Sequence, residues 1–180
     1  TFPEGSTLQQ MASVLQDSQL IPRQEFISFV KHAKPIFIAH YRFLEACPTE
    51  NLEGFLFPDT YFFAQGTDPS MVVDLCLSQF EKKIVGTWQL SGSPIKDKYS
   101  FYQILTLASM IEKEAQVYDE MPTIASVFFN RLTRGMALAS DPTVVYALGY
   151  SRKPIVTYRD LKIDSPYNTY MYQGLPPTPI

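Results

Sequence analysis

The segment LASMIEKEA closes a long apolar run with two glutamates, Glu112 and Glu114, that flank Lys113. A glutamate can give a proton to a leaving group and take one back, which is general acid and base catalysis. In a partly apolar cleft a carboxylic acid keeps its proton to higher pH, and this property suits a general acid. The alternative is a solvated helix end, where alternating charges only keep the surface polar.

The helix that would carry these glutamates is predicted from residue 101 to residue 114 or 115, because its apolar residues recur at helical spacing. Positions two apart lie about 200° apart around a helix, so Glu112 and Glu114 cannot do the same job. Glu112 lies at the edge of the apolar stripe, whereas Glu114 shares a flank with Leu107 and Met110 that we expect to face a cleft or another element. Periodicity alone does not choose between the two glutamates as catalyst. The stripe consists of Phe101, Ile104, Leu105, Ala108, Ile111 and Ala115.

The composition is that of a folded protein. The 180 residues are 46% hydrophobic and 18% charged, which allows one domain with its own core or a small domain attached to a larger one. The net charge of -3 and the lack of a basic run argue against a nucleic-acid partner. No apolar stretch reaches the ~18 residues that a membrane span needs.

No metal or organic cofactor is predicted. Cys47 and Cys76 form no C-x-x-C motif, and His32 and His40 do not complete a metal site with them. The flanks of both cysteines are typical of ordinary packing, although a disulfide between them stays open.

The first part of the chain predicts two short helices and an aromatic segment. The first helix begins after a cap at Ser6 or Thr7, and the second covers PRQEFISFVKHA. Residues 52–66, LEGFLFPDTYFFAQG, predict a strand-turn-strand unit or an extended arm, because five aromatic residues are interrupted by a turn sequence.

A longer helix is predicted next. Asp68 as N-cap and Pro69 as first helical residue begin it, and it runs to about residue 85. Residues 86–98 contain Gly, Ser and Pro, and they predict a polar loop.

Local signals also mark elements after the EKE motif. The segment PTIASVFFNRLTRG predicts a helix that ends at Gly135, and DPTVVYALG predicts another, with Asp141 as N-cap and Gly149 after its end. Thr157 and Asp160 resemble a capping box. The tail, rich in Tyr, Pro and Asn, predicts loop with at most one short strand.

Several segments, taken together and in this order, resemble the endolytic murein transglycosylase family, also called YceG-like. They are LEGFLFPDTY, LASMIEKEA, ASVFFNRLTRGMAL, SDPTVVYALG and SPYNTYMYQGLPP, within residues 52–180. The opening FPEGSTLQQMASVL also resembles the end of the LysM-like module that precedes the catalytic domain in this family. The resemblance implies an α+β fold, with a partial LysM-like module and linker helices in residues 1–50. A mixed, helix-rich catalytic domain in residues 51–180 would follow it.

This resemblance implies an enzyme that needs no cofactor. The family is anchored in the cytoplasmic membrane by an N-terminal helix, and its catalytic domain lies on the extracytoplasmic side, periplasmic or extracellular. It cleaves the β-1,4 bond between N-acetylmuramic acid and N-acetylglucosamine in nascent peptidoglycan strands and leaves 1,6-anhydro ends without consuming water. Cell-wall synthases are the expected protein partners. The second glutamate of the family's E-K-E motif, which is its catalyst, corresponds to Glu114.

Asp141 and Asn168 are the residues expected to line the site beside Glu114. Asp141 has the alternative role of N-cap, and the two roles can coexist. Asn168 has the alternative role of turn residue. Tyr167 and Tyr170 are interpreted as a sugar-stacking wall, with simple packing as the alternative.

Four further residues are interpreted as structural support for the site, without direct contact with the substrate. Glu112 is read as a structural partner of the catalytic glutamate, and Arg131 as an ion-pair partner for a buried acid, with Asn130 in a similar role. Glu53 is interpreted as a residue of the cleft wall or of the architecture.

The chain opens at Thr1 without an initiator methionine and ends in GLPPTPI, where the family usually has a glycine before the last Pro-Ile. We expect both ends to continue in a longer protein, including the membrane anchor and a segment that completes the catalytic domain. Two other functions remain as alternatives. One is a glycan-binding or scaffold module without catalysis. The other is a pyridoxal-phosphate-dependent aminodeoxychorismate lyase, for which Lys113 would be the Schiff-base lysine.

Overall fold

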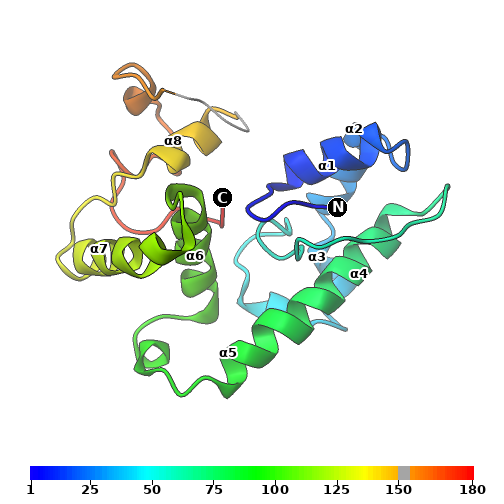
Figure 1. The fold of residues 1–180 in the computed structure, drawn as a ribbon, viewed down its shortest axis with the longest axis horizontal. Helices are drawn as coiled ribbons and strands as arrows, with labels where there is room; N and C mark the ends of the chain where they lie inside the picture. The colour runs from blue at the N-terminus through cyan, green and yellow to red at the C-terminus, as the bar shows by residue number, and fades with distance from the viewer. Residues whose placement is uncertain (150–154) are drawn as a thin grey trace. The chain divides into compact units, whose positions relative to one another are not determined.

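The structure, a computed structural model, describes residues 1–149 and 155–180, which form two compact units, Thr1–Tyr102 and Gln103–Ile180. Within the described ranges the chain consists of helices joined by turns and irregular segments, with no β-strand (Figure 1). The predicted α+β class is therefore wrong, and the structure does not support a LysM-like module in an α+β arrangement. The predicted module boundary at residues 50–51 lies inside the first unit and stays a prediction.

The first unit begins with short helices whose ends follow local rules. These are α1 (Leu8–Asp17), α2 (Arg23–Val30), α3 (Lys34–Phe37) and the 3₁₀ helix η1 (Arg42–Ala46). Thr7 caps α1 in a capping box with Gln10, which confirms the predicted start of this helix. α1 packs against α2, and α2 packs against α4.

The aromatic segment predicted as a strand pair or an arm is an extended arm. Its residues from 57 to 64 have no helical or sheet structure, because a strand needs a hydrogen-bonded neighbour and none of the described segments supplies a ladder. Asp59 accepts a hydrogen bond from the Phe2 backbone N–H at 2.9 Å and pairs with Lys83 at 2.8 Å. Figure 1 shows the arm running beside α4 (Pro69–Phe80).

Asp68 caps α4 and Pro69 is its first residue, as predicted. The predicted loop from residue 86 is wrong for its first five residues. α4 continues through the π-helical turn η2 (Glu81–Val85) into α5 (Gly86–Leu90), and η3 (Pro94–Asp97) follows. A glycine inside a helix costs only about 1 kcal/mol, and the Trp88 ring packs against Phe101 at 5.7 Å between ring centroids.

The second unit contains the helices that carry the chemistry. They are α6 (Phe101–Glu114), whose first two residues belong to the first unit, then η4 (Tyr118–Glu120), α7 (Met121–Thr133), α8 (Asp141–Ala147) and η5 (Asp160–Lys162). Gly135 and Gly149 follow the ends of α7 and α8 with φ of +64° and +75°, where glycine avoids the strain of a side chain. Thr157 and Asp160 make the reciprocal hydrogen bonds of the predicted capping box in the turn that leads into η5, whose own N-cap residue is Arg159.

The core of the second unit lies on the flank of α6 that also carries Glu114. Leu107 and Met110 from α6 join Phe128 from α7, together with Leu138 and Ile180. The flank was predicted to face a cleft or another element, and it packs against α7. The predicted stripe is only partly buried, and Ala108 is exposed, because the cluster lies around the flank instead.

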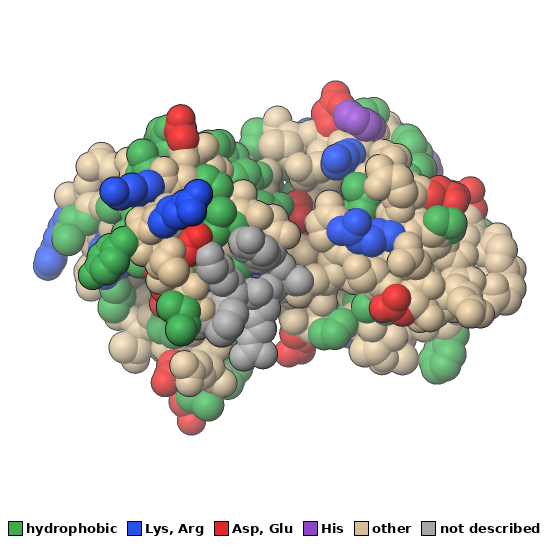
Figure 2. All heavy atoms as spheres, turned by 90° about the horizontal axis from the view of Figure 1, so that it is seen from above, with side chains coloured by type: hydrophobic (Ala, Val, Ile, Leu, Met, Phe, Trp, Pro, Cys, Tyr) green, Lys and Arg blue, Asp and Glu red, His purple; other side chains and the backbone are tan. Residues whose placement is uncertain are grey.

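Charged and hydrophobic side chains are mixed on the surface. On the face drawn in Figure 2, acidic and basic side chains are interspersed among hydrophobic and uncharged ones.

Cys47 and Cys76 are both buried and free, so they form no disulfide in this structure. Within the described residues, no helix has the length and apolar character that crossing a membrane requires.

Candidate active site

Glu114 is the last residue of α6, and its side chain is exposed. Its carboxylate accepts a hydrogen bond from the hydroxyl of Ser140, with 3.2 Å between Oγ and Oε2. Ser140 is buried and stands directly before α8. The end of α6 therefore meets the residue that directly precedes α8.

Asp141 lies beside this contact as the first residue of α8. The predicted N-cap role of Asp141 is wrong, because Ser140 is the N-cap residue and the cap has no side-chain hydrogen bond. The Asp141 carboxylate instead accepts a hydrogen bond from Tyr170, with 2.6 Å between Oη and Oδ1. A negative charge in the first turn also interacts favourably with the helix dipole.

Tyr170 connects the two carboxylates electrostatically. Burial, the hydrogen bond to Asp141 and the negative charges of Asp141 and Glu114 together raise the pKa of Tyr170 to about 12. The positive charge of Arg131 acts in the opposite direction. The four groups therefore lie in one electrostatic environment, and the Tyr170 phenol stays a hydrogen-bond donor throughout the ordinary pH range. Tyr170 as a residue is 38% exposed, so it can still contact a ligand.

We expect Tyr170 to ionise near pH 12, about two units above a free phenol. The stabilisation that its hydrogen bond provides is complete below pH 10 and is lost as the pH rises through 12, because the raised pKa belongs to the folded state. The measurement is a tyrosinate absorbance titration of the wild type minus that of Tyr170→Phe. In Asp141→Asn the midpoint should fall, since the neighbouring negative charge is gone. An unchanged midpoint in that variant would contradict the pairing.

Arg131 and Asn130 have different surroundings on α7. The Arg131 guanidinium donates to the backbone carbonyl of Leu138 and so ties α7 to the loop before Ser140. Among the described residues it makes no salt bridge with a carboxylate, so its contact differs from the predicted ion pair. Asn130 is exposed, and in the described part of the chain its side chain has no hydrogen-bond partner. Glu112 is half-buried and likewise shows no hydrogen bond to another described residue.

Asn168 is fully buried, and its side chain makes hydrogen bonds to backbone groups. Its Nδ2 donates to the carbonyls of Leu161 and Ile163, each at 2.9 Å, and its Oδ1 accepts from the Tyr170 N–H at 3.1 Å. Both donors of the amide are used, so these contacts favour the turn role over direct sugar contact. Through the bond to Tyr170, Asn168 also positions the ring that reaches Asp141.

Tyr167 packs inside the second unit. Its hydroxyl is 2.9 Å from the Thr178 hydroxyl, and its ring lies 4.9 Å from the Tyr146 ring between centroids. These contacts favour the packing alternative for Tyr167, whereas Tyr170 keeps an exposed ring.

Glu53 belongs to the first unit. It is buried, and its Oε1 accepts the Leu8 N–H at 2.9 Å, one of the amides at the start of α1 that no helical carbonyl satisfies. This contact fits the architectural half of its predicted role.

Sequence reasoning missed a group of buried hydroxyls next to Glu114. Thr143 and Thr169 lie beside Ser140, and all three side chains are at most 2% exposed. The Ser140–Glu114 and Thr143–Thr169 hydrogen bonds each join residues 26 positions apart in sequence, so no local pattern marks these contacts. The only signal is that Ser140 precedes an Asp-Pro helix start, and that signal was assigned to Asp141.

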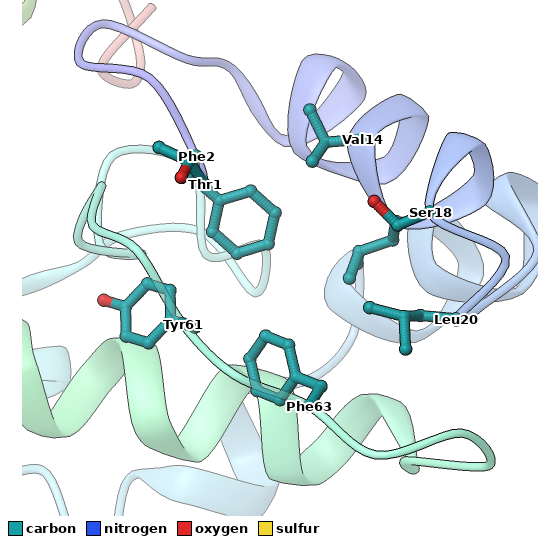
Figure 3. Close-up of a pocket in the computed structure, with 8 residues that line it drawn as sticks. Thr1, Phe2, Val14, Ser18, Leu20, Tyr61 and Phe63 are labelled. Carbon is teal, nitrogen blue, oxygen red and sulfur yellow. The ribbon is translucent and has the colours of Figure 1, made fainter.

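The first unit contains a small cavity that is separate from these groups. It has a volume of about 80 Å³, and Figure 3 shows the rings of Phe2, Tyr61 and Phe63 around it together with Leu20. No carboxylate lines it, so the cavity does not share the acid and base chemistry of the Glu114 region.

Proton transfer is the chemistry that the Glu114 region can perform. Glu114 has one oxygen bound by Ser140, and its Oε1 has no hydrogen-bond partner among the described residues. The Asp141 carboxylate already accepts a hydrogen bond from Tyr170, and this contact holds the Asp141 side chain in position. Across residues 1–149 and 155–180, no three His, Cys, Asp or Glu side chains gather as metal ligands would.

A family model for the YceG-like family matches residues 1–180. The chain belongs to the YceG-like family. It is 38% identical to a Bacillus subtilis protein (strain 168) named endolytic murein transglycosylase, over all of this chain and 51% of that protein. It is 34% identical to a Streptococcus pneumoniae protein (strain R6) of the same name, over all of this chain and 35% of that protein.

A solved structure of a YceG-like protein from Listeria monocytogenes has a similar fold. The TM-score is 0.85 at 34% sequence identity, and the match covers 99% of this chain and 60% of the Listeria chain. The YceG-like chain described here thus spans about half the length of its Bacillus relative and about a third of its Streptococcus relative.

Proposed function

We propose that this chain carries the catalytic centre of a lytic transglycosylase that cuts within peptidoglycan strands, with Glu114 as its acid and base. The names of the relatives support the reaction class. The observation that carries the assignment to Glu114 is its carboxylate, which is exposed, bound by Ser140 on one oxygen and unpartnered within the described residues on the other.

In the proposed reaction, protonated Glu114 donates its proton to the glycosidic oxygen between N-acetylmuramic acid and N-acetylglucosamine. The bond from that oxygen to C1 of the muramoyl residue breaks, and the bonding electrons leave with the N-acetylglucosamine hydroxyl. The C6 hydroxyl of the muramoyl residue attacks C1 and gives its proton to the Glu114 carboxylate. The product is a 1,6-anhydro ring, and the glutamate is protonated again.

A single carboxyl group suffices for this sequence. A hydrolase needs a second carboxylate to activate water or to attack the sugar, whereas here the nucleophile is part of the substrate and is already positioned. Positive charge develops on the sugar ring as the bond breaks. The paired Asp141 would stabilise that charge through space, and the exposed Tyr170 ring would contact the sugar face.

The proposal extends to the location and partners of the protein. A transglycosylase of this kind acts on nascent glycan strands, so it would be anchored in the cytoplasmic membrane with this domain on the extracytoplasmic side. Cell-wall synthases that make those strands would be its partners.

Product analysis tests the proposal. Uncrosslinked peptidoglycan strands are incubated with the full-length protein, and the fragments are identified by mass spectrometry. We expect shorter strands with 1,6-anhydro ends, which are lighter by one water than hydrolysis products. Reducing ends would mean hydrolysis, and intact strands that remain bound to the protein would favour a glycan-binding module.

A further inference from the structure

We propose that Ser140 is a positioning residue that holds the Glu114 carboxyl group by its Oε2 and so presents Oε1 to the substrate. The proposal rests on the proposed function, because it assigns the two oxygens of the same catalytic group. The contact is the 3.2 Å hydrogen bond from Ser140 Oγ to Oε2. This hydrogen bond links the end of α6 to the residue directly before α8.

The Ser140 backbone is held on both sides. Its N–H donates to Thr169 Oγ1 at 3.0 Å, and its carbonyl accepts from Thr143 Oγ1 at 2.7 Å. The two threonine hydroxyls are 2.9 Å apart. Since the Thr143 proton goes to the Ser140 carbonyl, Thr169 must donate to Thr143. The threonines therefore satisfy each other and the backbone, and they leave the Ser140 hydroxyl proton for Glu114.

The backbone before Ser140 is strained. Ala139 has a φ of +49°, in the left-handed region that non-glycine residues rarely adopt. Such a conformation persists when its surroundings over-determine it, and such residues cluster at functional sites. The Ala139 N–H donates to the Thr169 carbonyl at 3.0 Å, so Thr169 binds the amides of both Ala139 and Ser140. The strained turn directs the Ser140 side chain toward the end of α6.

This arrangement divides the work between the two oxygens of Glu114. Ser140 is 1% exposed, so its hydroxyl approaches Oε2 from the protein side. The exposed carboxyl group then offers Oε1 first to the glycosidic oxygen and later to the C6 hydroxyl. Without the hydrogen bond from Ser140, the Glu114 carboxyl group could rotate at the end of α6. Oε1 would then be poorly positioned both to protonate the glycosidic oxygen and to accept the proton of the C6 hydroxyl.

The test compares four variants of the full-length protein in the anhydro-product assay, with kcat and KM determined separately for each. Ser140→Ala should lower kcat about tenfold with little change in KM. Ser140→Cys keeps a weaker donor of similar size and should fall between Ser140→Ala and the wild type. Ser126→Ala, on the exposed face of α7, is the matched control and should match the wild type.

Thr143→Val separates positioning from folding. It removes a hydroxyl from the buried group but leaves the Ser140 hydroxyl, so it should lower the melting temperature without lowering kcat at a temperature where the variant is folded. If the wild type is active and Ser140→Ala has an unchanged kcat, the positioning role of Ser140 is overturned while the proposed function stands. Equal losses of kcat in Thr143→Val and Ser140→Ala would also overturn that role, because general loosening of the buried group would then explain both. If the wild-type protein itself formed no anhydro ends, the proposed function would be contradicted, and the role of Ser140 depends on that function.

Discussion

Glu114→Gln should reduce the formation of anhydro ends about a thousandfold or more. The general acid and base of a single-carboxyl mechanism contributes about 10²–10⁴-fold, and no second carboxylate replaces it in the proposed reaction. Glutamine has the same shape and still accepts the Ser140 hydrogen bond, so the geometry of the α6 end is retained. It cannot donate an acidic proton to the glycosidic oxygen.

Folding should survive this substitution. Glu114 is exposed and makes one side-chain hydrogen bond to the described residues, so we expect the melting temperature to change by less than about 3 °C. Binding of uncrosslinked strands should also persist. A variant that fails to bind or to fold would leave its lost activity without a catalytic explanation, and calorimetry and strand binding are therefore measured alongside the product assay.

Glu112→Gln is the informative comparison, because helical periodicity left both glutamates open. Glu112 lies two positions earlier, about 200° around α6, and makes no hydrogen bond to another described residue. We expect its activity to stay within a few-fold of the wild type. If Glu112→Gln were the inactive variant and Glu114→Gln the active one, the catalytic assignment would pass to Glu112.

Helix ends were predictable because their signals are local. Thr7 before α1, Asp68 before α4 and Gly135 after α7 each satisfy backbone groups within a few residues of themselves. Gly86 misled the prediction, since a glycine permits a loop but does not require one. In the structure the helix continues through Gly86 into α5, where Trp88 packs on Phe101.

Contacts between distant parts of the chain were not predictable. The five aromatic residues of residues 52–66 favour a strand pair or an extended arm, but a sheet also needs a partner strand, and the described chain offers none. On α6, the face that is buried depends on Leu138 and Ile180, which no helical wheel contains. Similarly, Ser140 and Glu114 are 26 positions apart, and only the fold brings the hydroxyl to the carboxylate.

The residues around the site divide by where their side chains make hydrogen bonds. Glu114, Asp141 and Tyr170 are exposed and share one electrostatic environment. Asn168 was predicted as a site residue from the segment that also contains Tyr170. Its side-chain amide nevertheless donates both of its hydrogen bonds to backbone carbonyls inside the second unit. A motif therefore marks both the groups that can meet a substrate and those that keep them in place, and burial separates the two.

Asn168→Ala should lower the free energy of unfolding by about 2–3 kcal/mol, the largest stability effect that we expect in the second unit. The substitution removes three hydrogen bonds and leaves the carbonyls of Leu161 and Ile163 without their donors, in a place that water reaches poorly. Chemical denaturation measures the loss. Hydrogen exchange should locate it, with faster exchange in residues 161–172.

Two comparisons show whether Asn168 acts through folding or through the substrate. Asn130→Ala, the matched control, removes an exposed amide from α7 and should change stability by less than about 0.5 kcal/mol. Asn168→Asp keeps the acceptor for the Tyr170 N–H but points an oxygen at two carbonyls, so it should destabilise at least as much as alanine. If Asn168→Ala kept full stability and lost only glycan binding, the sugar-contact alternative would be correct. We expect the opposite, because the amide has no donor left to offer a sugar.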